Sequence, residues 1–222
     1  MTDRVVLAID TSFGPVSAAL AAQDGTFIAG FEADNAAGTQ AETLPPRVAE
    51  LFLQTGIRYE QLSRVAVTVG PGAFTGVRVG LAFAKGLRVA TGATVLGFTT
   101  LECLAAQAAR LHPGAMIAVA IDAKRGEVYL QLFKAPPEPL MVGRLLSIGE
   151  AEILVRDRLS GPVVFAGSGA PLVRGAFVGH ALIEAIPRID ARLLAQRAAF
   201  ADPSLYPPDA AYLRAPDARL PS

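Results

Sequence analysis

The sequence is poor in the residues that most often build metal, disulfide and nucleophilic sites. It has one cysteine, Cys103, and two histidines among 222 residues. A single cysteine excludes an internal disulfide and a cysteine-rich metal site. Neither H-x-x-x-H nor H-E-x-x-H occurs, and Gly167-Ser168-Gly169 supplies only part of a G-x-S-x-G pattern. The composition therefore argues against a metalloenzyme and against a serine hydrolase.

The chain also lacks an excess of charge and a long apolar segment. Twenty acidic and twenty basic side chains give a formal net charge of zero, so no basic field would hold a nucleic acid by itself. No apolar run approaches membrane-spanning length, and the short apolar stretch after Arg4 does not suit a secretion signal. We expect a cytoplasmic protein with no membrane contact, in which 52% hydrophobic residues supply a real core.

What the sequence does contain is a regular succession of apolar runs and turn residues. In the first half they predict the order βββαβαβα, with Gly56 ending the first helix and a Thr99–Glu102 capping box starting the last. The predicted strands cover residues 5–10, 16–22, 26–32, 65–69 and 93–98, and the helices cover the stretch from about 44 to 55, 74–91 and 100–112.

After Pro113 the pattern begins again. Residues 6–20 align with 118–132, pairing Asp10 with Asp122, and residues 66–73 resemble 163–170, each an apolar strand running into G-x-G-A. Two elements repeated in the same order predict a duplication. We therefore expect an α/β fold of two similar lobes, residues 1–112 and 113–222, the second ending in a proline-rich extended tail.

The stretch from residue 67 to 86 is a strand, a Gly70-Pro71-Gly72 turn and a helix. It fits neither a Walker loop nor a dinucleotide fingerprint, since Lys85 precedes Gly86 and Gly76 comes one residue late. A vestigial nucleotide site, with magnesium held by the two aspartates, would use Asp10, Thr11, Ser12, Gly70, Gly72 and Asp122. The alternative is that each aspartate caps its own turn and the glycines allow tight strand-to-helix packing.

The helix over 74–91 is apolar on nearly every face except the stripe of Arg78 and Lys85. Such a helix must be covered on two sides, either by a second layer of the same chain or by another protein. Gly76, Gly80 and Ala84 recur every four residues, so another backbone can come close there.

Five motifs carry a family resemblance: I-D-T-S, G-P-G-A-F-T-G-V-R-V-G, T-T-L-E, D-A-K-R-G-E-V-Y and Y-L-R, spread from Leu7 to Arg214. Together they resemble the TsaB family of tRNA threonylcarbamoyladenosine biosynthesis proteins. The resemblance implies an actin-like, sugar-kinase-like duplicated fold. It also implies a non-catalytic subunit that assists the paralogous TsaD, which transfers a threonylcarbamoyl group to the adenosine beside the anticodon of tRNAs. The TsaE ATPase would be a further partner, and tRNA would be reached only through the complex.

The resemblance further implies that no metal or cofactor belongs to this chain itself. TsaD-type proteins bind metal through H-x-x-x-H on the first helix, whereas Gln40 stands here where many TsaB relatives keep one histidine. Pairing with TsaD would join the first two helices of each N-terminal lobe, and the same face could form a homodimer when the partner is absent. The predicted contacts are Leu44, Val48, Leu51, Gly76, Gly80, Phe83, Ala84 and Leu87.

A second function remains open from the residues alone. Asp10 and Asp122 would suit a self-sufficient ATP-dependent kinase or ATPase of the actin-like superfamily, with ATP and magnesium bound between the lobes.

Overall fold

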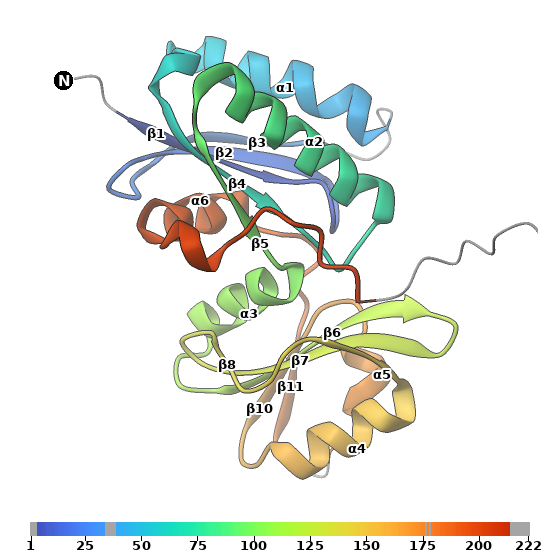
Figure 1. The fold of residues 1–222 in the computed structure, drawn as a ribbon. Coiled ribbons are helices and arrows are strands. Elements are labelled where there is room, and N and C mark those ends of the chain that lie inside the picture. Colours follow the sequence, from blue (N-terminus) through green and yellow to red (C-terminus); the bar gives the residue numbers. More distant parts are fainter. Residues whose placement is uncertain (1–3, 34–38, 176, 178, 214–222) are drawn as a thin grey trace, which may run out of the picture.

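The structure is a computed structural model that describes residues 4–33, 39–175, 177 and 179–213. It contains two mixed sheets with helices on both sides of each (Figure 1). From one end to the other, the layers are α1 and α2, the first sheet, α6, α3, the second sheet, and finally α4 and α5. None of the helices formed by the described residues combines the length and apolarity needed to cross a membrane.

The first sheet has the strand order β3-β2-β1-β4-β5, in which β1 runs antiparallel to β2 and parallel to β4. The predicted order βββαβαβα is confirmed, and the helix over 74–91 has the predicted bounds. The elements are β1 (Val5–Asp10), β2 (Val16–Ala22), β3 (Phe27–Ala33), α1 (Gln40–Thr55), the short 3-10 turn η2 (Tyr59–Gln61), β4 (Leu62–Thr68), α2 (Phe74–Thr91), β5 (Thr94–Phe98) and α3 (Thr100–Leu111).

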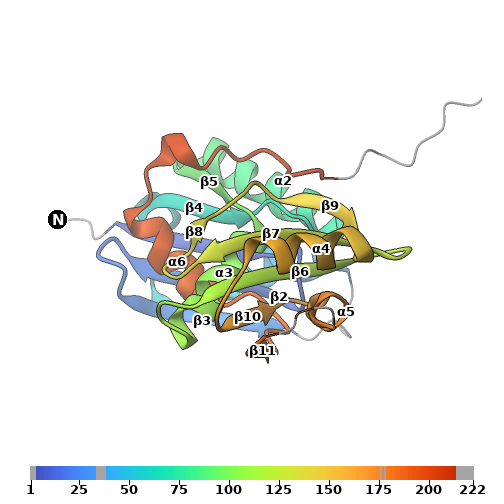
Figure 2. The same ribbon diagram turned by 90° about the horizontal axis from the view of Figure 1, so that it is seen from below.

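The second sheet repeats this plan in the order β11-β10-β6-β7-β8, with β9 also paired to β7. Again the first strand, β6, is antiparallel to the second and parallel to β10. The predicted duplication is therefore confirmed, with β8 and β9 sharing the place that β3 has in the first sheet. The elements are β6 (Met116–Lys124), β7 (Glu127–Lys134), β8 (Glu138–Pro139), β9 (Arg144–Ser147), α4 (Ile148–Arg158), β10 (Val163–Ala166), α5 (Ala170–Arg174), β11 (Ala181–Glu184) and α6 (Ala191–Phe200). Seen from below, α4 and α5 lie on the outer side of this sheet (Figure 2).

The repeated G-x-G-A turns have the same role in both halves. Gly70 and Gly167 begin them in the left-handed region, with φ of 95° and 91°, which glycine adopts without strain. The turns then dock on the preceding hairpin: Ala73 N donates to Ser12 O at 2.9 Å, and Gly169 N donates to Ala120 O at 2.9 Å. In each lobe the duplicated motif therefore joins the turn before a helix to the preceding hairpin by a backbone hydrogen bond.

The last helix of each half crosses to the other half. α6 packs on β1, β2 and β4 of the first sheet, while α3 packs on β6, β7 and β10 of the second. One hydrophobic cluster consequently contains Ala8 and Phe98 from the first sheet, Val119 from the second, and both helices. The strands of the first sheet precede residue 112 and those of the second sheet follow it, yet the two halves share a core.

After α6 and the 3-10 turn η3 (Pro203–Leu205), residues 206–213 form an extended strap. Gly97 N donates to Tyr206 O at 3.0 Å, so the strap covers part of the open edge of β5. Tyr206 stacks on Phe98 with ring centroids 4.2 Å apart, and Tyr212 lies 5.6 Å from Phe74. The tail is extended as predicted up to Leu213, while Arg214, Pro216 and Pro221 lie outside the described residues.

A polar network joins the strap to the two crossing helices. Glu102 of α3 accepts from Arg197 of α6 and, at 3.2 Å, from the Tyr206 hydroxyl. The Arg197 and Glu102 side chains are only 21% and 20% exposed. Because removing one partner leaves a poorly solvated charge, we expect Arg197→Met to lower the free energy of unfolding by about 2 kcal/mol. Urea denaturation measures this.

A double-mutant cycle with Glu102→Met provides the control. If the two side chains act as a pair, the double variant is more stable than the sum of the two single losses predicts. Strict additivity would contradict the pairing.

Candidate functional site

Five of the six residues predicted for a vestigial nucleotide site meet at one place. The turn after β1 carries Asp10, Thr11 and Ser12, and it lies against the Gly70–Gly72 turn that leads into α2. Ser12 Oγ is 3.0 Å from Thr100 Oγ1 at the start of α3, and Thr100 N donates to Gly70 O at 2.8 Å. The sixth residue, Asp122, lies in the hairpin of the second sheet.

Asp10 is fully buried, and both of its carboxylate oxygens accept hydrogen bonds from neighbouring residues. Oδ1 accepts from Ser12 N at 2.9 Å, Ser12 Oγ at 2.8 Å and Thr68 Oγ1 at 2.5 Å, and Oδ2 accepts from Phe13 N at 3.4 Å. Burial raises the pKa of Asp10, against the hydrogen bonds from Thr68 and Ser12 that lower it. This geometry supports the turn-capping interpretation and fits poorly with a magnesium ligand, which needs carboxylate oxygens open to the ion.

Asp122 has a different environment from its repeat partner. Its carboxylate accepts from Lys124 N at 2.8 Å and from Lys124 Nζ at 2.7 Å. These hydrogen bonds lower the pKa of Asp122. Like Asp10, it caps the turn that follows its strand, but near the surface.

Replacement of Asp10 tests the structural role. Asp10→Ala would leave the buried Ser12 amide and Thr68 hydroxyl and the part-buried Phe13 amide without this acceptor, so we expect a loss of about 2 kcal/mol in the free energy of unfolding. Asp10→Asn keeps one acceptor oxygen and should lose less.

The pH dependence of the asparagine variant gives a second readout. Because burial raises the pKa of Asp10, its protonated form is favoured more in the folded state than in the unfolded state. The stability of the wild type relative to Asp10→Asn is therefore greatest below the unfolded pKa and falls as the pH rises through the folded pKa. Parallel stability curves from pH 4 to 8 would contradict this.

The stripe of small residues on α2 packs on its own chain. A side chain carbon at Gly76 would overlap the carbonyl oxygen of Thr11, and one at Gly80 would lie 2.5 Å from Thr11 Oγ1. Thr11 Oγ1 in turn donates to Gly76 O at 2.6 Å. The backbone that comes close to this stripe is thus the turn after β1.

The surface placement of most predicted partner contacts is therefore wrong. α1 and α2 turn these side chains inward onto the first sheet, where they contribute to its core or to the contact with Thr11. The buried residues are Leu44, Val48, Leu51, Gly76, Gly80, Ala84 and Leu87. Phe83 is half-buried and stays a predicted contact.

The opposite sides of the same two helices carry exposed small and apolar residues beside the exposed charges of Glu50, Arg78 and Lys85. Leu53 is 83% exposed and Val89 is 89% exposed. We call this the outer α1–α2 face and define it by the exposed residues Ala49, Leu53, Ala82, Gly86 and Val89. It lies in the outermost layer of the first lobe (Figure 1).

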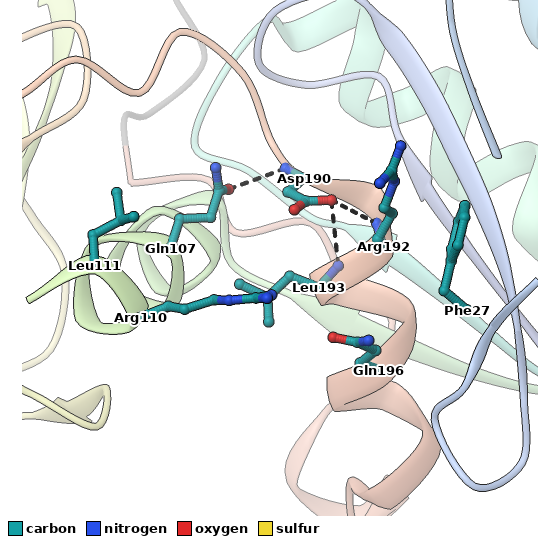
Figure 3. Close-up of a pocket in the computed structure, with 8 residues that line it drawn as sticks. All are labelled: Phe27, Gln107, Arg110, Leu111, Asp190, Arg192, Leu193 and Gln196. Carbon is teal, nitrogen blue, oxygen red and sulfur yellow. Dashed lines mark hydrogen bonds between the residues drawn. The ribbon is translucent and has the colours of Figure 1, made fainter. Parts of the chain in front are cut away.

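A groove lies between the two crossing helices, on the β3 side (Figure 3). Its volume is about 410 Å³, and its walls include Phe27, Arg110 and Arg192. Gln107 of α3 holds the loop before α6, since its Nε2 donates to Arg188 O and its Oε1 accepts from Asp190 N, both at 3.1 Å. Sequence reasoning missed this groove. The one local signal is Asp190, which caps α6 by accepting from Arg192 N.

Comparison with known proteins gives one consistent family. A family model described as "TsaD: tRNA N6-adenosine threonylcarbamoyltransferase" matches residues 26–151. The tRNA threonylcarbamoyladenosine biosynthesis protein TsaB of Escherichia coli K12 is 33% identical over 167 residues, which is 74% of this chain and 71% of that protein. The TsaB protein of Bacillus subtilis 168 is also 33% identical and covers 75% and 72%. The chain belongs to the TsaB family.

Solved structures agree with this assignment. YeaZ from Pseudomonas aeruginosa superposes on this TsaB-family chain with a TM-score of 0.71 and 27% identity, covering 89% of this chain and 91% of that one. Component A of (R)-2-hydroxyglutaryl-CoA dehydratase from Acidaminococcus fermentans is 11% identical with a TM-score of 0.52. The latter likeness concerns the fold alone, which is the actin-like duplicated fold predicted from the sequence.

The sequence of this TsaB-family chain contains no H-x-x-x-H pattern, and Gln40 is the first residue of α1. Within the part of the chain that the structure describes, no three His, Cys, Asp or Glu side chains gather to form a group that could hold a metal ion.

Proposed function

We propose that this chain is a non-catalytic subunit in tRNA threonylcarbamoyladenosine biosynthesis, acting by binding a TsaD-type transferase. The observation that carries the binding role is the outer α1–α2 face, where Leu53 and Val89 are more than four-fifths exposed. Aliphatic side chains of this exposure among small residues suit a helix-to-helix contact, because the small residues let the partner approach.

Two features support a role without catalysis by this chain. Both oxygens of Asp10 accept hydrogen bonds inside the fold, so the carboxylate that a nucleotide-binding paralogue would direct at magnesium is used for structure. The turn after β1 also lies tightly against the glycines of α2, where a phosphate would otherwise need room. A TsaE-type ATPase would be a further partner, and tRNA would be contacted through the assembled complex.

Size-exclusion chromatography with light scattering tests the proposed pairing. The chain mixed with a TsaD-type subunit should elute with the mass of a heterodimer. In the complete reaction with TsaD, TsaE, ATP and tRNA, omission of this chain should abolish turnover. Normal turnover without it would contradict the proposed function. The chain alone, at increasing concentration, shows whether the same face forms a homodimer.

The second candidate is an ATP-dependent kinase or ATPase, for which the duplicated fold is the supporting observation. It requires Mg-ATP to bind this chain by itself. Calorimetric titration with millimolar Mg-ATP decides the point, since saturable binding that Asp122→Ala removes would favour this candidate over the scaffold role.

A further inference from the structure

A second, smaller cavity lies beside the groove, between β2, β3 and the start of α6. Its volume is about 130 Å³, and it is separate from the predicted partner face. Its walls include Ser17 and Gly30 from the two strands and Asp190 and Arg192 from the start of α6. The last two also line the 410 Å³ groove, so the cavity and the groove adjoin. Since one water occupies about 30 Å³ in the liquid, the cavity has room for a molecule of a few heavy atoms.

The Ser17 hydroxyl at this cavity is buried and unpartnered. Ser17 is 2% exposed, and its Oγ has no hydrogen-bond partner among the described protein atoms. A buried hydroxyl without a partner costs about 1–3 kcal/mol, so native proteins almost always supply one, from the chain, from water or from a ligand. Ala191 N–H, the first amide of α6, also has no acceptor within its helix. Ser17 and Ala191 both line the cavity.

The charges around the cavity are balanced. Arg192 and Arg188 bring positive charge, while Glu32 and Asp190 bring negative charge. Glu32 Oε1 is 2.5 Å from Arg188 Nε, and Asp190 uses Oδ1 to cap α6. Asp190 Oδ2 takes no part in that cap. The Arg192 guanidinium lies over the Phe27 ring, with its carbon 4.6 Å from the ring centroid, and the N–H groups along its edge can still donate to a guest. Two carboxylates at the wall disfavour a phosphate dianion, because like charges repel strongly where water is scarce.

We propose that this cavity binds a small zwitterion of the α-amino acid type. Its carboxylate accepts from Ser17 Oγ and Ala191 N–H and pairs with Arg192, while its ammonium group lies against Asp190. A side chain on the ligand extends into the adjoining groove, whose wall is apolar at Leu111 and Leu193. The site lies where the loop from β11 enters α6, so an occupant would contact elements of both lobes.

NMR titration of the full chain tests the proposal directly. We expect L-alanine and L-leucine to shift the amide signals of Ser17, Gly30 and Ala191 with saturation in the millimolar range. Acetate and methylammonium each carry one of the two charges and should not saturate there. Absence of saturable shifts with any amino acid at 20 mM would overturn the proposal and leave water as the occupant, and saturation with inorganic phosphate instead would replace it with an anion site.

Variants separate recognition from folding. Ser17→Ala removes a buried hydroxyl that has no protein partner, so it should not lower the melting temperature of the free chain, while it should weaken amino acid binding roughly tenfold. Arg192→Met should weaken binding by at least as much. Arg110→Met is the matched control, because Arg110 lines only the larger groove, and it should leave the affinity for L-alanine unchanged. A Ser17→Ala variant that is destabilised and binds normally would overturn the assignment.

Discussion

Gly76→Ala is expected to lower the free energy of unfolding by more than about 3 kcal/mol, beyond the usual 1–3 kcal/mol of overpacking. The added carbon would overlap the carbonyl oxygen of Thr11, which is backbone and cannot rotate away. Relief requires α2 to move off the turn after β1. That movement would break the bond from Thr11 Oγ1 to Gly76 O and the bond from Ala73 N to Ser12 O.

The expected drop in melting temperature is roughly 6–12 °C for a chain of this size, and it can be followed by circular dichroism. Gly86→Ala is the matched control, since Gly86 is exposed on the same helix and an added carbon there meets no atom within 4 Å. In a helix interior alanine is favoured over glycine by roughly 1 kcal/mol, so this variant should be slightly stabilised. Equal losses of stability in both variants would show that helix geometry, and not the close approach of Thr11, requires glycine at position 76.

The local structure of the first half follows from its sequence because each element carries its own start or stop. Thr99 caps α3 by accepting from Glu102 N, and Gly56 ends α1 in the left-handed conformation. The repeat was likewise visible because both copies keep the aspartate turn and the G-x-G-A turn that dock on each other. In the second half, α4 and α6 were not predicted, although Ser147 and Asp190 cap them.

Most residues predicted as partner contacts are buried within this chain for a physical reason. Apolar periodicity identifies the side of a helix that avoids water, but it does not distinguish a sheet of the same chain from another protein. Leu44, Val48 and Leu51 avoid water by packing on the first sheet. The sequence likewise does not show whether the glycines on α2 face a partner or this chain. In the structure Gly76 and Gly80 lie against Thr11 of the same chain. The exposed residues at Leu53 and Val89 break the periodic pattern, and that irregularity was the available signal.

The groove and the small cavity were beyond sequence reasoning because their walls come from distant parts of the chain. Gln107 and Asp190 are 83 residues apart, yet one hydrogen bond places the start of α6 against α3. No local pattern reports that α6 crosses to the first sheet, so a hydroxyl on β2 such as Ser17 could not be placed beside it.

Val89→Asp and Leu53→Asp are expected to weaken the proposed complex with a TsaD-type subunit by roughly 30-fold or more, the effect of losing a central interface residue. Each change would bury a carboxylate against apolar partner atoms if the outer α1–α2 face is the interface. The folding of the free chain should hardly change, because both side chains are more than four-fifths exposed. Isothermal titration calorimetry and the transferase assay measure the two consequences.

The control for these variants is Ile153→Asp on α4, where another apolar side chain is 51% exposed but lies in the second lobe. It introduces the same charge and should bind normally. Since the transferase reaction needs this chain in the proposed function, Val89→Asp should lose turnover at low concentration and regain it when the chain is added in excess. If Val89→Asp lost turnover but bound the TsaD-type subunit normally, binding and support of turnover would be separate roles, and the interface would lie elsewhere. A defect in docking alone is overcome by mass action when the chain is in excess.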